Sequence, residues 1–388
     1  MADNKDNKVL NVPALRFPEF TEEWEKCKFK DVCKITTGNK NTQDKVENGL
    51  YPFYVRSQNI ERINSWTFDG EAILTAGDGV GVGKVFHYSV GKIGVHQRVY
   101  ILSDFKCNGK YLYQYFSSHF YNRVKRMSAK NSVDSVRMEM IADMPLYLPS
   151  IGEQYKIGKL LALIDERMAT QNKIIEKYES LIQAMCDTLI EKEAQLVMLS
   201  FEDFGESYSG LSGKSAEDFG EGSPYITYMN VYQNQIIDIT DIGLVKIDKT
   251  EQQSLVQYGD ILFTLSSETP EEVGMGAVYL GETYPLYLNS FCFGIHITDE
   301  SKIFSPFLAY YVSSESFRKA VFPLAQGSTR FNLQKGDFMK KVFPFPTIEQ
   351  QRKIYSILKN YSDKLNIEKQ MIKLLCCQKQ YLLRQMFI

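Results

Sequence analysis

The chain has 388 residues, of which 44% are hydrophobic, 24% charged and 13% aromatic, and its formal net charge is −2. This composition is typical of a folded globular protein and excludes a disordered or collagen-like chain. The length exceeds that of one ordinary domain, so we expect at least two hydrophobic cores with linkers between them.

No apolar run approaches the roughly 18 residues that a membrane-spanning helix needs, and the first residues contain no apolar signal core. We therefore expect a cytoplasmic protein without membrane contact. The seven cysteines form no CxxC pair, so they are expected to be reduced, buried thiols.

The charge is distributed unevenly along the chain. Residues 15–148 hold 19 basic and 15 acidic residues, and residues 149–199 hold 6 and 8. Residues 200–345 hold 10 and 19, and residues 346–388 hold 8 and 3. Binding to nucleic acid needs positive groups that face phosphates. The chain meets this condition only if the acidic remainder faces away from the DNA or toward a partner.

The sequence contains an internal repeat. The segment Pro149–Ile157 is matched by Pro346–Ile354 at an offset of 197 residues, with six of nine positions identical or nearly so. Residues 111–118 resemble residues 307–314, and residues 70–75 resemble residues 259–264, at somewhat smaller offsets. The repeat predicts two domains of one fold, each followed by a long helix. We divide the chain into a disordered or extended N-terminus (1–14), a first domain (15–148), a first long helix (149–199), a second domain (200–345) and a second long helix (346–388).

The first domain is expected to be mixed and mainly β. Short apolar or alternating runs such as 72–75 and 94–102 are typical of strands, and the aromatic-rich segment 110–127 is typical of a helix. The stretch Gly77–Lys84 contains four glycines but fits neither GxGxxG nor GxxxxGK[ST]. It predicts a glycine-rich hairpin or, alternatively, a loop whose backbone approaches a polyanion closely.

Basic and amide side chains gather in the apparent loops of the first domain. Arginine and lysine recognise guanine in the major groove of DNA, and asparagine and glutamine recognise adenine. The candidate DNA-binding residues are Lys40, Arg56, Gln58, Asn59, Lys84, Arg98, Lys125, Arg126, Lys130 and Arg137, with Gln97, Arg123 and Asn131 beside them. The alternative for each is an ordinary solvated surface residue.

The first long helix is predicted from apolar residues that recur in steps of four and three, which is a heptad seam with only Gln171 polar. The second long helix repeats the seam, with Glu368 in the place of Gln171. The seam residues are Ile157, Leu161, Ile164, Met168, Gln171, Ile175 and Tyr178, and Ile354, Leu358, Tyr361, Leu365, Glu368, Ile372 and Leu375.

Each helix of about 40 residues would be roughly 60 Å long at ~1.5 Å per residue. A lone seam would expose its apolar stripe, so we expect the two helices to bury each other as an antiparallel coiled coil related by a pseudo-twofold axis. The alternative is that each helix folds back on its own domain. The predicted fold class is therefore α+β, with two similar, mainly β domains joined by two long antiparallel helices.

The second domain repeats the mixed pattern. Strands are expected in 261–265, 277–280 and 291–297, and helical structure in 305–322. The segment 318–341 holds six basic residues and one acidic residue inside an otherwise acidic domain. The candidate DNA-binding residues here are Asn230, Arg318, Lys319, Arg330, Asn332 and Lys335.

A catalytic or metal-binding constellation is absent from the sequence. The four histidines show no HExxH spacing or cysteine pairing, and the chain contains no GxSxG motif. We expect a chain that is not itself a catalyst and that holds no metal or cofactor of its own.

Taken together, these features resemble the DNA specificity subunit of type I restriction-modification systems. The resemblance rests on residues 13–20 with Trp24, on the glycine stretch, on the duplicated Pro-[Ser/Thr]-Ile-x-x-Gln-x-Lys-Ile helix start and on the heptad helices. It implies that residues 15–148 and 200–345 are target-recognition domains, each recognising one half of a bipartite double-stranded DNA target, while the helices set the gap.

The same resemblance implies partners. These are two methyltransferase (modification) subunits and, through the complex, restriction and motor subunits, which would hold S-adenosylmethionine, ATP and Mg. The main alternative is a coiled-coil scaffold that binds protein partners without recognising a DNA sequence. A nuclease or transferase is disfavoured because no phosphate, metal or nucleophile constellation is visible.

Overall fold

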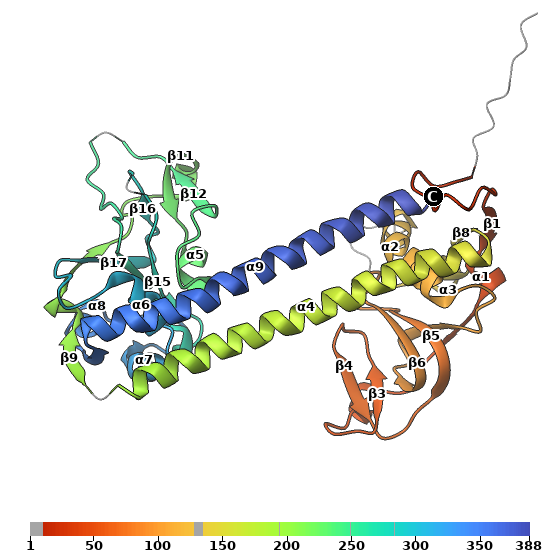
Figure 1. Cartoon of the computed structure of the whole chain (residues 1–388), viewed down its shortest axis with the longest axis horizontal. Coiled ribbons are helices and arrows are strands. Elements are labelled where there is room, and N and C mark those ends of the chain that lie inside the picture. Colours follow the sequence, from red (N-terminus) through yellow and green to blue (C-terminus); the bar gives the residue numbers. More distant parts are fainter. Residues whose placement is uncertain (1–10, 128–134, 194, 249, 283) are drawn as a thin grey trace, which may run out of the picture. The chain divides into compact units, whose positions relative to one another are not determined.

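The computed structural model describes residues 11–127, 135–193, 195–248, 250–282 and 284–388. The chain forms two compact units: unit 1 is Met1–Asn172 with Gln370–Ile388, and unit 2 is Lys173–Lys369. The division falls inside the two long helices, α4 (Ile151–Glu191) and α9 (Ile348–Met386), which are drawn in Figure 1. Each unit therefore contains one globular domain and one part of each long helix.

Unit 1 is built on a six-stranded sheet in the order β2-β7-β5-β6-β3-β4. Its strands are β2 (Lys34–Thr37), β3 (Tyr51–Tyr54), β4 (Ile60–Ile63), β5 (Phe68–Ala76), β6 (Phe86–Val95) and β7 (Val99–Ser103). The glycine stretch joins β5 to β6, which pair antiparallel, so the predicted hairpin is confirmed.

The predicted strand 94–102 was wrong as a single element, because it contains the end of β6, a tight turn and β7. His96 forms this turn: its ring Nδ1 accepts the backbone N–H of Arg98, and its carbonyl accepts the backbone N–H of Val99. Two local hydrogen bonds therefore reverse the chain where the apolar pattern alone predicted a continuous strand.

Unit 1 also contains helical segments. They are α1 (Phe29–Val32), η1 (Thr42–Asp44), α2 (Gly109–Met127) and α3 (Met138–Ala142), and α2 confirms the helix predicted for 110–127. The aromatic face of α2 is buried in a core with Trp24 and Phe29. Ile157 of α4 and Met386 of α9 belong to the same core. Both long helices are therefore anchored in unit 1 by apolar burial.

Unit 2 contains a four-stranded sheet in the order β10-β17-β13-β15 and two three-stranded sheets, β12-β11-β16 and β14-β19-β18. The strands are β10 (Gly205–Ser209), β11 (Phe219–Ile226), β12 (Ile242–Val245), β13 (Ile261–Thr264), β14 (Ser266–Ser267), β15 (Gly276–Val278), β16 (Tyr287–Leu288), β17 (Cys292–Ile297), β18 (Ala325–Gln326) and β19 (Phe331–Leu333). The strands predicted in 261–265, 277–280 and 291–297 correspond to β13, β15 and β17.

The helical segments of unit 2 are short: η2 (Phe201–Asp203), η3 (Ala216–Asp218), α5 (Tyr228–Gln233), η4 (Pro270–Glu272), α6 (Ser305–Tyr311), α7 (Glu315–Val321), η5 (Phe322–Leu324) and α8 (Lys335–Lys340). The segment predicted to be helical at 305–322 is divided into α6, α7 and η5. The break occurs because Ser314 caps α7, its side chain accepting the backbone N–H of Phe317.

A two-stranded antiparallel ribbon precedes each long helix. In unit 1 it pairs β1 (Glu25–Lys28) with β8 (Pro145–Leu148), and in unit 2 it pairs β9 (Leu196–Ser200) with β20 (Val342–Pro346). Strand β9 corrects the predicted first helix of 149–199, which ends at Glu191. The last residues of that prediction leave the helix because their backbone pairs with β20, and tertiary pairing outweighs local helix propensity.

A buried glutamine fastens each long helix to its domain. Gln154 accepts the backbone N–H of Asn108 at 2.9 Å and donates to the carbonyl of Pro149 at 2.8 Å. Gln351 does the same with the backbone N–H of Phe304 at 2.8 Å and with the proline before its own helix at 2.9 Å. This pair of bonds explains why the repeated helix start keeps a glutamine at the same place.

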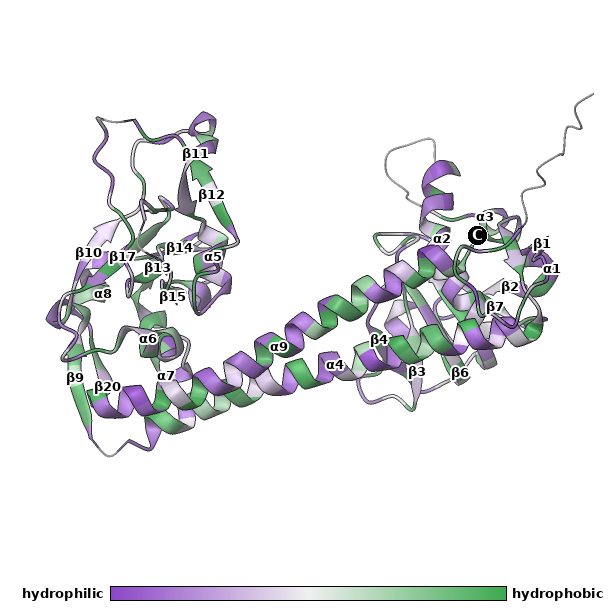
Figure 2. Ribbon diagram, turned by 45° about the horizontal axis from the view of Figure 1, so that its top comes forward, coloured by the Kyte–Doolittle hydropathy of each residue, from purple (hydrophilic) through white to green (hydrophobic). Residues whose placement is uncertain are grey.

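The predicted seam residues of α4 and α9 are all buried or half-buried. In unit 1, Asp165 forms an ion pair with Lys379 at 2.5 Å, and in unit 2, Glu179 forms one with Lys369 at 2.7 Å. Within each unit the two helices run in opposite directions (Figure 1). Figure 2 shows hydrophobic and hydrophilic residues alternating along both helices. The predicted α+β class, with long antiparallel helices, is confirmed.

Candidate nucleic-acid interface

Four segments of unit 1 converge beside the β5–β6 hairpin. The backbone N–H of Gln97 donates to the carbonyl of Lys40 at 2.8 Å, and that of Gly77 donates to the carbonyl of Arg98 at 2.8 Å. The Arg56 side chain reaches Asp78 in the hairpin. Candidates that lie far apart in the sequence, Lys40, Arg56 and Arg98, are thus brought to one place.

Asp78 lies between two guanidinium groups. Its Oδ1 accepts from Arg56 Nη1 at 2.9 Å, and its Oδ2 lies 3.6 Å from Arg98 Nε. The arginine side chains are 46% and 65% exposed, and the aspartate is 28% exposed. The group therefore keeps its hydrogen-bonding atoms accessible from solvent.

The remaining candidates of this cluster are exposed. Gln58 and Asn59 follow β3 and are solvent-exposed, as is Lys84, whose ammonium lies 5.7 Å from the ring centre of Tyr121. Val80, in the hairpin between them, is 98% exposed.

His96 supports the turn that holds Arg98. The pKa of His96 is lowered, first by burial and then by the nearby positive charge of Arg56. The neutral ring suits this place, because Nδ1 must accept the N–H of Arg98 while Nε2 faces Thr42 Oγ1 at 3.3 Å. Protonation at Nδ1 would remove that acceptor.

A second basic group of unit 1 lies at the end of α2. Lys125, Arg126 and Arg137 are exposed, whereas Arg123 donates to the carbonyl of Met140 at 2.7 Å. Arg126 lines a pocket of about 230 Å³ together with His119. The candidates Lys130 and Asn131 lie outside the described residues.

Two candidates of unit 2 are structural residues. Asn230 is fully buried, and its side-chain amide donates to the carbonyls of Asp238 and Asp241 while accepting the N–H of Asp238. Arg318 donates to three carbonyls, those of Glu271, Val273 and Gly274, at 2.6–2.7 Å. Burial lowers the pKa of Arg318. The prediction that Asn230 contacts DNA was wrong, because its side chain is fully buried and its polar atoms are used inside the domain. Contact of Arg318 with DNA stays a prediction, because its half-buried guanidinium uses only three of its five donors inside the domain.

The other candidates of unit 2 are accessible to different degrees. Lys319 is exposed but forms an i,i+4 ion pair with Glu315 at 2.5 Å. Asn332 is exposed on β19, and the ammonium of Lys335 lies 3.4 Å from Ser209 Oγ. Arg330 is exposed, with its guanidinium 5.9 Å from the ring centre of Phe291.

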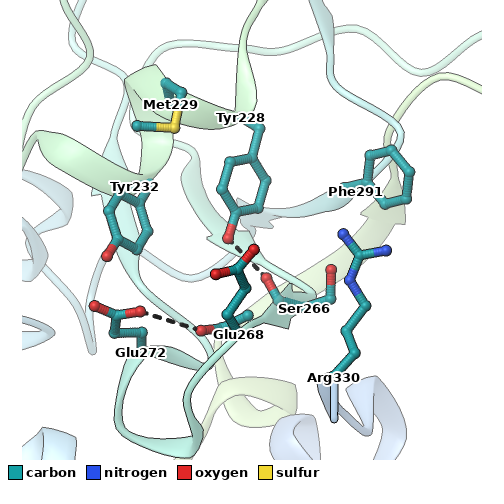
Figure 3. Close-up of a pocket in the computed structure, with 9 residues that line it drawn as sticks. Tyr228, Met229, Tyr232, Ser266, Glu268, Glu272, Phe291 and Arg330 are labelled. Carbon is teal, nitrogen blue, oxygen red and sulfur yellow. Dashed lines mark hydrogen bonds between the residues drawn. The ribbon is translucent and has the colours of Figure 1, made fainter. Parts of the chain in front are cut away.

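Arg330 and Phe291 line one side of a pocket of about 290 Å³, shown in Figure 3. Tyr228 and Tyr232 stack at the other side, with centroids 5.9 Å apart, and the Tyr228 hydroxyl donates to the carbonyl of Ser266 at 2.7 Å. Hydrogen bonds, chiefly from Tyr232, lower the pKa of Glu272. The pocket thus presents aromatic faces, one guanidinium and carboxylates to the solvent.

Reasoning from the sequence missed two features of these sites. Asp78 was overlooked because the glycine stretch was interpreted through its glycines and its backbone, although Asp78 is the one acidic residue in that stretch. The aromatic pocket of unit 2 was missed because its rings come from separate segments, which no local pattern connects.

Among the described residues, no group of three or more His, Cys, Asp or Glu is arranged to hold a metal ion. Within the same part of the chain, no helix combines the length and apolar character needed to cross a bilayer.

The fold defines a class of chains in which one α+β module occurs twice, each module attached to a long helix by a buried glutamine. The family model of the type I restriction modification DNA specificity domain matches residues 21–180 and again residues 198–375. Because these two matches include most of the chain, the chain belongs to this family. Membership confirms the predicted resemblance to the family of type I DNA specificity subunits.

Known proteins agree with this assignment. The chain is 26% identical over 167 residues to the type I restriction enzyme EcoDI specificity subunit of Escherichia coli. The matched region is 42% of this chain and only 37% of the length of the relative.

Solved structures show the same fold. The S subunit of a type I restriction-modification system from M. genitalium matches with a TM-score of 0.63 and 16% identity, over 97% of this chain and 99% of that one. A chain from a structure on complex assembly and conformational transition of the type I R-M system matches with a TM-score of 0.54 and 12% identity, over 94% and 97%.

Proposed function

We propose that this chain is the DNA-recognition subunit of a type I restriction-modification complex. In this proposal each domain recognises one half of a bipartite double-stranded target. The observation that carries it is the double match of the specificity-domain family on two domains. Exposed basic and amide side chains of both domains, such as Arg56 and Arg330, supply the donors that base recognition needs.

The two half-sites are expected to differ in sequence. Unit 1 exposes two arginines around an aspartate, whereas unit 2 exposes one arginine over a phenylalanine. Different donors in different surroundings select different bases.

The long helices are proposed to set the gap between the half-sites. Helix α4 has 41 residues and α9 has 39, and each is continuous. At ~1.5 Å per residue such helices measure about 60 Å, which is less than two turns of B-DNA at about 34 Å per turn. Half-sites about one turn apart, on one face of the duplex, would fit this length.

Catalysis and motor activity are assigned to partner subunits. We expect two methyltransferase subunits bearing S-adenosylmethionine, and restriction and motor subunits that use ATP and Mg. The relatives are named for restriction enzymes and type I R-M systems, which supports such an assembly. The assembly is expected to work in the cytoplasm, and its methyltransferase is expected to flip the target adenine out of the duplex.

The direct experiment is to map methylated adenines. The chain is expressed with its methyltransferase partner in a host without adenine methylation, and genomic DNA is sequenced for N6-methyladenine. The expected result is one bipartite motif, absent when either protein is omitted. A stable complex that marks no split target would favour the scaffold alternative.

The spacing role is tested by insertion. Four residues, about one helical turn, are inserted after Gln171 in α4. The expected result is a longer accepted gap or loss of assembly. An unchanged gap in an intact complex would contradict the proposed role of the helices.

A further inference from the structure

The arginines of unit 1 are held by a hairpin that fits tightly against them. A Cβ atom on Gly81 would lie 2.3 Å from the carbonyl oxygen of Arg56, so only glycine permits this approach. Gly79 has a φ of +79°, which L side chains rarely adopt. The hairpin therefore places Asp78 against Arg56 and Arg98 through its backbone shape.

The geometry leaves N–H donors of both guanidinium groups, those of Arg56 and Arg98, available for a ligand; we call each guanidinium with its parallel donors a fork. A guanidinium has five N–H donors, and within the described residues Asp78 is the only carboxylate that either fork contacts. Arg56 contacts it through Nη1 and Arg98 through Nε. Each guanidinium thus keeps donors for a bidentate partner, while the carboxylate restrains Arg56 by a hydrogen bond and Arg98 by an ion-pair contact. Restraining a side chain before binding lowers the entropy lost on binding.

The position of the carboxylate favours a neutral partner over a phosphate. An anionic oxygen placed between two guanidinium groups repels an incoming phosphate and partly neutralises the charge that would attract it. The O6 and N7 atoms of guanine form a neutral acceptor pair that matches an arginine fork.

Stability does not account for the arrangement. The arginines are 46% and 65% exposed, and exposed ion pairs contribute little to the free energy of unfolding. A group that is accessible, held in place and of little value to stability is suited to binding.

We propose that Asp78 positions Arg56 and Arg98 for bidentate contacts with two guanines in the half-site recognised by unit 1. This inference rests on the proposed function and extends it to named bases. Asp78 acts here as a positioning residue, and Arg56 and Arg98 make the contacts.

The test uses the assembled methyltransferase complex and scores each base of the marked motif. The wild-type motif is expected to contain at least two guanines in one half-site. Arg56→Lys and Arg98→Lys keep the charge but lose the fork, so each should relax one of these guanines, by about 5- to 100-fold in discrimination. Asp78→Asn should relax both guanines and leave the other half-site unchanged.

The matched control is Glu61→Gln. Glu61 pairs with Lys45 at 2.7 Å in the same domain, and these side chains are 30% and 48% exposed, much as Asp78 and Arg56 are. This substitution should change no base preference. Tryptophan fluorescence confirms that each variant is folded, because Trp24 and Trp66 both belong to unit 1.

Three results would overturn the inference: a motif without guanine in either half-site, full discrimination in folded Asp78→Asn together with both lysine variants, or equal losses at both half-sites. If Asp78→Asn does not fold, the two lysine variants decide alone. A wild-type complex that marks no bipartite target would instead refute the proposed function, so the two failures are distinguishable.

Discussion

In unit 1, Arg56 and Arg98 lie exposed around Asp78, whereas in unit 2 three of the five donors of the Arg318 guanidinium are used by carbonyls of its own domain. The sequence suggested candidate basic residues in both domains. The structure shows that these side chains differ in how many donors they keep free. Whether a positive side chain can bind DNA therefore depends on the acceptors already beside it.

The two units resemble each other more closely in how the long helices are attached to the domains than in their loops. Gln154 and Gln351 each bond a backbone N–H and the carbonyl of the preceding proline, and Gln351 also donates to the carbonyl of Lys302 at 3.0 Å. Unit 1 adds a part-buried ion pair, in which the Arg16 guanidinium donates to the Glu153 carboxylate at 2.7 and 2.8 Å. Residue 350, which aligns with Glu153 in the repeat, is a glutamine. Unit 1 thus depends on a charge pair that the repeat of unit 2 lacks.

The largest expected effect follows from that pair. Arg16→Ala leaves the Glu153 side chain, which is fully buried, without its partner, and should cost unit 1 about 3–5 kcal/mol. Denaturation followed by tryptophan fluorescence reports unit 1, and labelling of the buried Cys292 reports unit 2.

Two controls accompany this variant. Lys156→Ala removes an exposed partner of Glu19 and should cost less than about 1 kcal/mol. Adding Glu153→Gln to Arg16→Ala should recover part of the loss, because a neutral amide replaces the buried charge. Equal destabilisation of both units by Arg16→Ala would contradict their independence.

Next in size is Asn230→Ala. It leaves the carbonyls of Asp238 and Asp241 without their donor, and should destabilise unit 2 by about 3 kcal/mol. Asn332→Ala, at an exposed position, should leave stability unchanged and weaken recognition of the half-site of unit 2. A stable Asn230→Ala variant with altered base preference would restore Asn230 as a DNA contact.

A smaller difference is expected on acidification. Burial is the main cause that lowers the pKa values of His87, His96 and His119, all in unit 1, below 6.5. As pH falls through about 6.5, these histidines become protonated in the unfolded chain but stay neutral in the folded domain. The free energy of unfolding of unit 1 therefore decreases. In unit 2, carboxylates such as Asp203 have pKa values lowered from 3.8, and their contribution is lost only below that pH.

The measurement compares tryptophan fluorescence with far-UV circular dichroism between pH 7.5 and 5. The fluorescence midpoint in urea should fall relative to the dichroism midpoint. Parallel shifts of the two signals would show that the histidines do not distinguish the units.

The smallest effect is expected at Lys319. Its ion pair with Glu315 is exposed at both ends, with side chains 73% and 64% accessible. Lys319→Ala should therefore leave the free energy of unfolding of unit 2 nearly unchanged. A cost similar to that of Asn230→Ala would contradict this reading of the surface.

The sequence predicted the repeated architecture well, because heptad spacing and a duplicated helix start are local patterns. It placed the end of α4 too late, since β9 forms only through pairing with the distant β20. It also assigned Asn230 to DNA, because a residue type does not reveal whether its polar atoms are satisfied within the fold. The role of Asp78 could not be predicted from the sequence, because its contact with Arg98 depends on the turn after β6, which places Arg98 beside the hairpin.

The glutamine joint has a consequence for how such chains can change. The atoms to which the Gln154 and Gln351 side chains hydrogen-bond all belong to the backbone, in Asn108, Pro149, Lys302, Phe304 and Pro346. Every amino acid type other than proline supplies the same backbone amide and carbonyl. These hydrogen bonds therefore do not depend on the side chains of the domain to which the helix is attached. The loops of each domain can therefore be replaced while the glutamine contacts of the long helices stay the same. A chain of this kind can acquire a different DNA target without a change in its helices.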